Sequence, residues 1–474
     1  MSFFNFNYNF KRESITHEQQ RKNWKIEFFK TYMVVCLGYA VMYLVRNNFK
    51  AAQPFMKEQF EFTTTDLGWI GLGFSISYGI GRTLIGYFFD GKNTKKILAV
   101  LLGISGILAI IIGITLATLG KTIGFLIILW TINGAIQSTG GPCSASTIRR
   151  WVTDTRRGTW QGIWNISHNI GGALAGIIAL GAANIFFGGN VYGMFIFPGL
   201  IALFLGIVGL FIGKGDPREL GWGSIEEIFE EPSVSSEMEA SSMSKKEIVI
   251  KYIIKNPFIW LLCFANIFVY ILRIGVDNWA PLYVTESLNF SGTVAVNTIF
   301  FFEIGGFVGS LVWGWISDKL GGRRIFLSVV CLIVMPFAYG MYQTGSLVIV
   351  IYISLFLIGL LVFGPISLIG ISVIDFAPKQ ATTVASAIPG TFGYIFGDAI
   401  AKVAIARIAD PEENGLKIFG RVLHGWNDQF ILFYVSIAAA VLLLVFVAIE
   451  ENKRCVIRKK QIEQYRKENS YEAV

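Results

Sequence analysis

Long apolar runs, such as residues 101–120 and 438–449, recur along the whole chain. Of its 474 residues, 53% are hydrophobic and only 15% are charged, whereas a soluble protein carries about 25% charged residues. A membrane-spanning helix needs about 20 apolar residues, so the chain is long enough for twelve. This pattern predicts an all-α, multi-pass membrane protein. It excludes soluble enzymes, nucleic-acid-binding proteins and secreted disulfide scaffolds.

Charged and Gly/Pro/Asn-rich segments separate the apolar runs into expected spans. These are 29–49, 67–89, 97–119, 122–148, 159–184, 192–213, 257–279, 294–316, 324–342, 346–374, 382–408 and 427–449. An acidic, Ser-rich stretch between the sixth and seventh spans is typical of a solvated linker. The predicted organisation is an N-terminal arm (1–28), a six-helix bundle (29–213), a linker (214–256), a second six-helix bundle (257–449) and a tail (450–474).

The distribution of Lys and Arg predicts the orientation. Of the 40 such residues, 30 fall in the arm, linker, tail and loops of one side, and the opposite loops hold Lys50, Lys57, Lys121, Lys417 and Arg421. Positive residues concentrate on the cytoplasmic side of a membrane. We therefore expect a plasma-membrane protein with both termini in the cytoplasm.

The two halves repeat one another at a nearly constant offset. The segments YLVRNN, with Arg46, and YILRIG, with Arg273, lie 227 residues apart, and Gly171 and Gly397 lie 226 apart. Gly141-Pro142 likewise precedes Gly364-Pro365 by 223 residues. Two units repeated in the same orientation predict bundles related by a pseudo-two-fold axis, as in many transporters.

Two loops of the repeat, GYFFDGKNTKK and GWISDKLGGRR, follow spans two and eight and share the pattern G-x-x-x-D-x-x-x-x-(K/R)-(K/R). This pattern resembles the signature loop of the major facilitator superfamily. Each acidic residue can pair with the following cations and hold neighbouring helices closed on the cytoplasmic face; the alternative is ordinary juxtamembrane cations whose charge reaches water. The expected gate residues are Asp90, Lys95 and Lys96 in the first loop and Asp318, Arg323 and Arg324 in the second.

Ionisable residues inside a membrane are costly, so each needs a partner or a function. Within spans, Arg273 and Asp277, like Asp398 and Lys402, are four residues apart on one helix face and could pair. Glu303 is a further buried acid expected to take part in ion pairs. The remaining candidates are Arg46, Arg82, Arg407 and Asp375, the last two near helix ends.

Arg46 has no carboxylate within four residues and occupies the position equivalent to Arg273. Equivalent helices of a two-fold repeat face each other, so the two arginines are expected to form a clamp in a central cavity. A guanidinium offers two parallel hydrogen bonds to an oxyanion. The pair therefore predicts an anionic substrate, most simply a phosphate group; the alternative is two structural arginines, each paired with a carboxylate.

A longer motif, RGTWQGIWNISHNIGG (157–172), surrounds His168, the one histidine within an expected span. It resembles the signature R-G-x5-W-N-x2-H-N-x-G-G of the organophosphate:phosphate antiporter family, and segments such as YLVRNNFKAAQP look most like its hexose-phosphate branch. The resemblance implies a phosphate site at Arg46 and Arg273 with His168 nearby. It also implies uptake of hexose phosphates, such as glucose 6-phosphate, in exchange for inorganic phosphate.

Two departures from that branch concern the organic part of the substrate. Arg82 stands where the branch commonly has Lys, and Ser386 and Pro389 replace an Asp and a Lys that some members carry in span eleven. Sugar hydroxyls are expected to bind polar or aromatic cavity residues. The candidates are Asn165, Tyr43, Tyr270, Trp279 and Tyr394.

The expected mechanism is obligatory exchange by alternating access, without enzymatic chemistry, cofactor or metal. An empty cavity with paired arginines strands positive charge when it closes, whereas a bound phosphate monoester carries −1.5 to −2 charges. The partners are phosphate esters, inorganic phosphate and the lipid bilayer, with the protein as a monomer. Alternatives are a glycerol-3-phosphate or phosphoglycerate antiporter, a membrane hexose-phosphate sensor and a proton-coupled carrier of neutral sugars.

Overall fold

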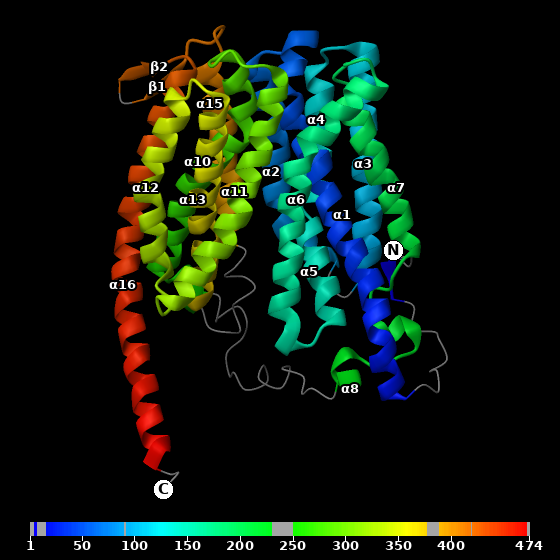
Figure 1. The fold of residues 1–474 in the computed structure, drawn as a ribbon, viewed down its shortest axis with the longest axis vertical. Coiled ribbons are helices and arrows are strands. Elements are labelled where there is room, and N and C mark those ends of the chain that lie inside the picture. Colours follow the sequence, from blue (N-terminus) through cyan, green and yellow to red (C-terminus); the bar gives the residue numbers. More distant parts are fainter. Residues whose placement is uncertain are drawn as a thin grey trace. The chain divides into compact units, whose positions relative to one another are not determined.

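The computed structural model describes residues 4–6, 16–89, 92–229, 250–376, 388–418 and 420–471, and they are almost entirely helical (Figure 1). The first half contains α1 (His17–Phe60), α2 (Thr64–Phe89), α3 (Thr94–Leu119), α4 (Ile123–Gln137), α5 (Gly140–Trp151), α6 (Asp154–Phe186), α7 (Gly193–Phe211), η2 (Pro217–Leu220) and α8 (Ile225–Phe229). The second half contains η4 (Ile250–Ile254), α10 (Pro257–Glu286), α11 (Gly292–Lys319), α12 (Arg324–Thr344), α13 (Val348–Asp375), η6 (Gly393–Asp398), α15 (Ala399–Ala409), η7 (Trp426–Asp428) and α16 (Gln429–Tyr471).

Ten helices among the described residues are long and apolar enough to cross a membrane. α4 and α5 together make one of them, separated by the two turn residues Ser138 and Thr139 just before the Gly-Pro pair of the repeat. α2, with 26 residues, and the segment formed by η6 and α15 occupy the two other expected spans. The predicted all-α, twelve-span architecture is thereby confirmed.

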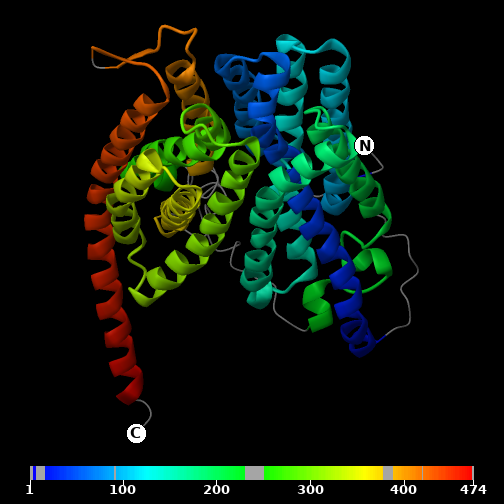
Figure 2. The same cartoon turned by 45° about the horizontal axis from the view of Figure 1, so that its top comes forward.

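Several helices extend beyond the expected spans. α1 begins at His17, inside the expected arm, behind a capping box in which Thr16 and Gln19 exchange hydrogen bonds, and it ends at the left-handed Glu61. It therefore places Lys50 inside a helix rather than in the expected loop. α16 continues past the expected end of its span to Tyr471. A short antiparallel hairpin, β1 (Leu416–Ile418) and β2 (Arg421–Leu423), connects α15 to α16 (Figure 2).

Contacts divide the chain into two compact units that do not follow the two halves of the sequence. Unit 1 comprises residues 1–242, 276–304 and 402–426, and unit 2 comprises residues 243–275, 305–401 and 427–474. Unit 1 therefore joins the whole first half to parts of α10, α11 and α15 from the second half.

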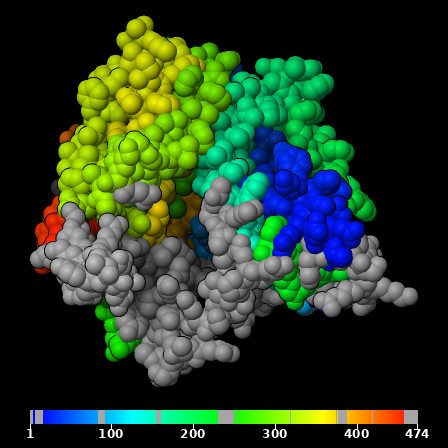
Figure 3. Space-filling model, turned by 60° about the horizontal axis from the view of Figure 1, so that its bottom comes forward, coloured from blue at the N-terminus to red at the C-terminus, as the bar shows by residue number. Residues whose placement is uncertain are grey.

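Aromatic rings hold the beginning of α1 in unit 1. The ring of Trp24 stacks on Phe28 with centroids 4.8 Å apart, and Phe28 meets Trp160 edge-on at 4.8 Å. The Trp24 indole donates a hydrogen bond to the Trp151 carbonyl at the end of α5. Figure 3 shows the first turns of α1 (blue) beside the segment that contains α8 (green); there Arg21 Nε donates to the Ile228 carbonyl.

Glycines let the helices of unit 1 approach one another closely. A Cβ on Gly171 of α6 would lie 2.0 Å from the Ala40 carbonyl oxygen of α1, and one on Gly106 of α3 would lie 2.6 Å from the Gly199 carbonyl of α7. Small residues are the usual means of helix contact in membranes, where lipid supplies no hydrophobic drive for association. The α1–α6 contact thus depends on a glycine of the 157–172 motif.

We expect Gly171→Ala to destabilise the protein, because a methyl group at this position must displace the backbone of α1. Overpacking of this kind costs about 1–3 kcal/mol. The matched control is Gly181→Ala on the same helix, where nothing lies within 4 Å of the new Cβ. Thermal unfolding in detergent should show a clear drop for Gly171→Ala and none for Gly181→Ala; equal unfolding temperatures would contradict the close contact.

Candidate functional site

Arg46 of α1 lies among aromatic rings in unit 1. Its Cζ atom is 4.5 Å from the ring centroid of Tyr78, 4.9 Å from that of Phe74 and 5.3 Å from that of Tyr43. Tyr43 comes from the preceding turn of α1, and Phe74 and Tyr78 come from successive turns of α2. Rings at these distances stabilise a cation by about 0.5–2 kcal/mol each, without adding a negative charge.

His168 joins this group through the ring of Tyr43. The two ring centroids are 5.1 Å apart, and the imidazole Nδ1 makes a short contact with the Asn165 carbonyl one turn earlier on α6. Tyr39 extends the stack, because its centroid is 4.7 Å from Trp164 and 6.2 Å from His168. The structure thus brings together Arg46, Tyr43 and His168, which the sequence predicted as site residues.

Two further predicted cations lie on or beside α2. Lys402 of α15 is buried and donates from Nζ to Ser75 Oγ at 2.6 Å and to the Gly71 carbonyl at 3.3 Å. Its ammonium also lies 5.7 Å from the centroid of Phe74, the ring that Arg46 contacts. Arg82 lies one helical turn after Tyr78, and its side chain is exposed.

Glu303 of α11 is 1% exposed and receives hydrogen bonds from two carboxamides. Asn47 Nδ2 lies 3.3 Å from Oε1, and Asn169 Nδ2 lies 3.2 Å from Oε2. A Cβ on Gly172 would come within 2.8 Å of Oε1, so this glycine leaves room for the carboxyl group. The sequence marked Glu303 as a buried acid but missed Asn47 as its neighbour, since a single Asn carries no signal of its own.

The motif 157–172 can now be interpreted residue by residue. Trp164 packs on Tyr39, His168 lies beside Tyr43, and Asn169 binds Glu303, while the two glycines admit α1 and the Glu303 carboxyl group. The motif therefore lies on one side of the group of residues around Arg46. Side chains of residues 154–159, including Arg157, lie outside the described part of the structure.

Arg273 of α10 has a related environment in unit 2. Its Cζ atom lies 4.6 Å from the ring centroid of Phe363 and 6.0 Å from that of Tyr270, which is one turn earlier on the same helix. Tyr270 meets Tyr394 edge-on, with centroids 5.1 Å apart. The side chain of Arg273 is 8% exposed.

The same Tyr-x-x-Arg pattern thus produces the same contact in both halves. Tyr43 with Arg46, and Tyr270 with Arg273, are repeat-equivalent pairs in which the guanidinium lies over the ring one turn earlier. Sequence alone gave the offset of 227 residues. The structure adds that each arginine is held against aromatic rings within its own unit.

One ion pair joins residues at the same repeat offset. Lys50 Nζ contacts Asp277 Oδ2 in unit 1, and both side chains are largely buried. Lys50 lies one turn after Arg46 on α1, and Asp277 lies one turn after Arg273 on α10. The sequence suggested Arg273 as the partner of Asp277; it missed Lys50, because the expected span ended at residue 49.

Comparison with known proteins identifies the family. The profile of the Major Facilitator Superfamily matches residues 35–401. The chain belongs to this superfamily.

Its relatives within the superfamily cover almost the whole length. The hexose-6-phosphate:phosphate antiporter of Escherichia coli K12 is 42% identical over 449 residues, which are 94% of this chain and 96% of that protein. The glycerol-3-phosphate transporter of Bacillus subtilis is 33% identical over 89% of this chain and 92% of its own length. Among solved structures, a D-xylose–proton symporter gives a TM-score of 0.65 at 15% identity, covering 89% of this chain and 97% of its own.

In this member of the superfamily, further contacts join the end of α1 and the beginning of α2 to the parts of unit 1 that come from the second half. Lys57 Nζ lies 2.6 Å from Glu286 Oε1, and the Trp426 indole donates to Glu286 Oε2 at 2.9 Å. The backbone N–H of Thr65 donates to Asp410 Oδ2 at 2.8 Å. Burial alone would raise the pKa of the Asp410 carboxyl group, but the hydrogen bond from Thr65 lowers it overall, so Asp410 is charged at neutral pH.

The predicted gate residues of the superfamily's signature loops are only partly described. Asp90 and the side chain of Asp318 lie outside the described residues, as do Ser386 and the side chain of Asp375. Lys95 is buried and donates to the Leu210 carbonyl at 3.3 Å. Lys96 lies in the first turn of α3, Arg323 precedes α12 and Arg324 begins it. The gate pairs therefore stay predictions.

Two remaining predictions concern span eleven and metal binding. The Pro389 carbonyl accepts a hydrogen bond from buried Asn266 at 2.7 Å, so this proline links span eleven to α10. Asp398 is 1% exposed and lies at the end of η6, four residues before Lys402.

Within the described ranges, no cluster of three His, Cys, Asp or Glu side chains could hold a metal ion.

We expect Asp277→Asn to destabilise unit 1, because it leaves the Lys50 ammonium buried without its counter-charge. Removing one partner of a buried pair costs about 3–5 kcal/mol. In a thermal unfolding cycle, the double variant Lys50→Met/Asp277→Leu should lose less stability than the sum of the losses in Lys50→Met alone and Asp277→Leu alone.

The matched control is the exposed pair of Lys22 and Glu18, 3.1 Å apart with side chains 73% and 79% exposed. Glu18→Gln should leave the unfolding temperature unchanged, because exposed pairs contribute little. Additive losses at Lys50 and Asp277 would show that the two charges do not depend on each other.

Proposed function

We propose that this protein is a hexose phosphate:phosphate antiporter that works by alternating access. The observation that carries the proposal is the Tyr-x-x-Arg pair repeated in the two halves, with each guanidinium held over aromatic rings. The 42% identity to a hexose-6-phosphate:phosphate antiporter over nearly the whole chain supports the substrate class. By the distribution of Lys and Arg, both termini are cytoplasmic and uptake runs toward them; the protein acts as a monomer.

Arg46 and Arg273 are proposed to bind the phosphate group. A phosphate ester presents oxygens to which a planar guanidinium donates two parallel hydrogen bonds, which an ammonium cannot match. Aromatic rings orient each guanidinium and compensate part of its desolvation without neutralising it. His168, beside Tyr43, completes the group on the α1 side.

Exchange rather than free uptake follows from the cost of moving buried charge. With no anion bound, closing the cavity transfers guanidinium charge into a low-dielectric interior at a cost of several kcal/mol. A phosphate monoester brings −1.5 to −2 charges and offsets most of this cost. The loaded carrier therefore switches faster than the empty one, and phosphate leaves only when another phosphate compound replaces it.

The contacts at the C-terminal end of α1 are the ones that must break during alternation. Lys50 with Asp277, and Lys57 with Glu286, tie α1 to α10 within unit 1. For the substrate to enter between these segments, both pairs must separate and their charges must be hydrated. We propose that they form the gate on the side opposite the termini.

The organic part of the substrate is proposed to contact the aromatic and polar residues next to the arginines. Tyr43 is buried beside Arg46, and Tyr270 is buried beside Arg273. Tyr394 is buried against Tyr270, and Asn165 is exposed on α6 one turn before His168. Arg82, exposed on α2, adds a positive charge that a second acidic group on the substrate could use. The second candidate function is glycerol-3-phosphate exchange, favoured by the 33% identity to such a transporter.

The test is counterflow in reconstituted vesicles. Vesicles loaded with inorganic phosphate should take up labelled glucose 6-phosphate, and vesicles without phosphate should not. Equal uptake in both would refute obligatory exchange. Competition of labelled phosphate exchange by glucose 6-phosphate, glycerol 3-phosphate and phosphoglycerate then decides the substrate. Stronger inhibition by glycerol 3-phosphate would favour the second candidate. A membrane sensor, by contrast, should export negligible phosphate from loaded vesicles.

We expect Arg46→Lys and Arg273→Lys each to reduce phosphate exchange by at least tenfold, because an ammonium replaces the two parallel hydrogen bonds by one point charge. Arg454→Lys is the matched control, since Arg454 is half exposed and pairs with Glu450 one turn earlier on α16. Membrane content of each variant, measured by quantitative blotting, separates loss of transport from loss of protein. Near-normal exchange in either site variant would contradict the proposed role.

A further inference from the structure

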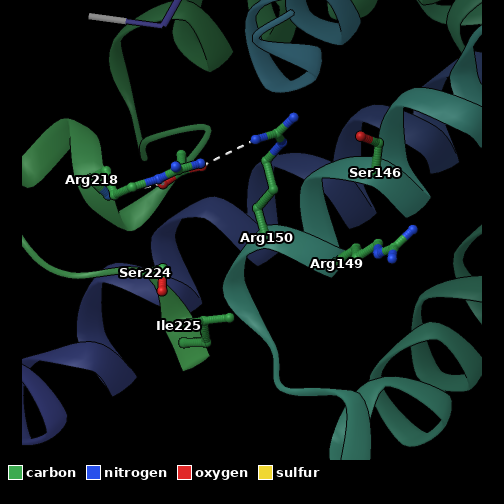
Figure 4. Close-up of a pocket in the computed structure, with 7 residues that line it drawn as sticks. Ser146, Arg149, Arg150, Arg218, Ser224 and Ile225 are labelled. Carbon is green, nitrogen blue, oxygen red and sulfur yellow. Dashed lines mark hydrogen bonds and ion pairs between the residues drawn. The ribbon is translucent and has the colours of Figure 1, made fainter. Parts of the chain in front are cut away.

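A second basic site lies away from the residues proposed for transport, where α5 ends and the segment after α7 folds back in unit 1. A cavity of about 300 Å³ is lined by Ser146, Arg149, Arg150, Asp216, Arg218, Ser224 and Ile225 (Figure 4). Three arginine residues therefore line one cavity with a single described carboxylate among its walls. All the lining residues belong to the same unit.

Asp216 organises two of these arginines. Arg218 donates two hydrogen bonds to its carboxylate, from Nε to Oδ1 at 2.9 Å and from Nη2 to Oδ2 at 2.7 Å. Arg150 Nη1 lies 3.2 Å from Oδ2. Figure 4 shows Arg150 extending from α5 toward Arg218, and the dashed line marks the contact of Arg150 with Asp216. Burial alone would raise the pKa of the Asp216 carboxyl group, but Arg218, with Arg150, lowers it overall. The carboxylate is therefore ionised at neutral pH and offsets one of the three positive charges.

Arg150 is held in place but incompletely hydrogen-bonded. Its guanidinium lies over the ring of Phe6, with Cζ 4.4 Å from the centroid. Its Nε atom is buried and has no hydrogen-bond partner among the described residues. A buried donor without a partner destabilises the folded state, so an oxyanion that reached Nε would remove that cost. Ser146 and Ser224 add hydroxyl groups to the wall of the same cavity.

The surroundings of the cavity are well ordered by hydrogen bonds. Asn93 Nδ2 donates to Glu219 Oε1 at 2.9 Å, and the Gly215 N–H donates to Glu219 Oε2 at 2.7 Å. The Trp151 indole donates to the Lys214 carbonyl at 2.9 Å. The segment that carries Asp216 and Arg218 is thus fixed to the beginning of α3 and the end of α5. Arginines on such a frame are positioned before any ligand arrives.

We propose that this cavity binds a phosphate group from a compound other than the transported one. The net positive charge, the planar guanidiniums and the two serines suit a phosphate oxyanion, and the cavity volume admits a phosphate group with a small substituent. Two sources offer the same chemistry: the headgroup of an anionic phospholipid such as phosphatidylglycerol, and a phosphate dissolved in the aqueous phase. The ligand would fasten the 214–225 segment to α5, because it would contact arginines from both.

The test measures thermal unfolding of delipidated protein in detergent, in an Arg46→Lys background that weakens the proposed transport site. Short-chain phosphatidylglycerol, phosphatidylcholine and inorganic phosphate are titrated separately. We expect saturable stabilisation by phosphatidylglycerol or by inorganic phosphate, and at least a tenfold higher half-saturation concentration in Arg150→Gln and Arg218→Gln. Arg454→Gln, far along the chain on α16, is the control and should leave the half-saturation concentration unchanged.

The two sources give different outcomes. Stabilisation by phosphatidylglycerol alone identifies a lipid headgroup, and stabilisation by inorganic phosphate identifies a dissolved ligand. A second variant, Ser146→Asp, places an anion in the cavity; it should raise the unfolding temperature of the ligand-free protein and abolish the response to ligand. No stabilisation by either compound, or the same half-saturation concentration in Arg150→Gln as in the control, would overturn the proposal, and neither result depends on whether the protein transports hexose phosphate.

Discussion

The constraint on which this structure depends is the cost of an arginine inside a membrane. A guanidinium there must be hydrated, paired or placed against polarisable groups. Arg46 and Arg273 are both placed over the aromatic rings of neighbouring helices, and in each case one ring belongs to a tyrosine one turn earlier. Rings hold the cation in position and leave its charge in place. A cation held in position in this way is suited to bind an anion.

The neighbouring charges are arranged differently, in ways that suit a structural role. Lys50 pairs with Asp277, and Lys402 donates to a serine hydroxyl and a backbone carbonyl. Glu303 is satisfied by the carboxamides of Asn47 and Asn169. These buried groups fix the positions of α1, α6, α10 and α11 in unit 1. The pair of Lys50 with Asp277 also belongs to the proposed gate, where hydration of both charges would replace the contact between α1 and α10.

The sequence predicted the fold class, the repeat and, of the residues around Arg46, Tyr43 and His168, because long apolar runs, fixed offsets and the 157–172 motif are local patterns. It did not predict the rings of Phe74 and Tyr78 or the pair of Lys50 with Asp277. Lys50 lies beyond the point where hydropathy falls, and only the continuous helix to Phe60 brings it to Asp277. It also missed the cavity at Arg150, since Arg149 and Arg150 look like ordinary loop cations until Asp216 and Arg218, more than sixty residues later, fold against them. Contacts between distant segments, rather than element types, were what the sequence left undetermined.

The most direct test of the account is equilibrium binding of inorganic phosphate to the purified protein, measured without transport. Binding of radiolabelled phosphate should saturate in the native protein and be displaced by glucose 6-phosphate. Arg46→Gln and Arg273→Gln should each weaken the displaceable binding by at least tenfold, while Arg454→Gln should leave it unchanged. Displaceable binding of native affinity in either site variant would contradict the claim that these two arginines hold the phosphate.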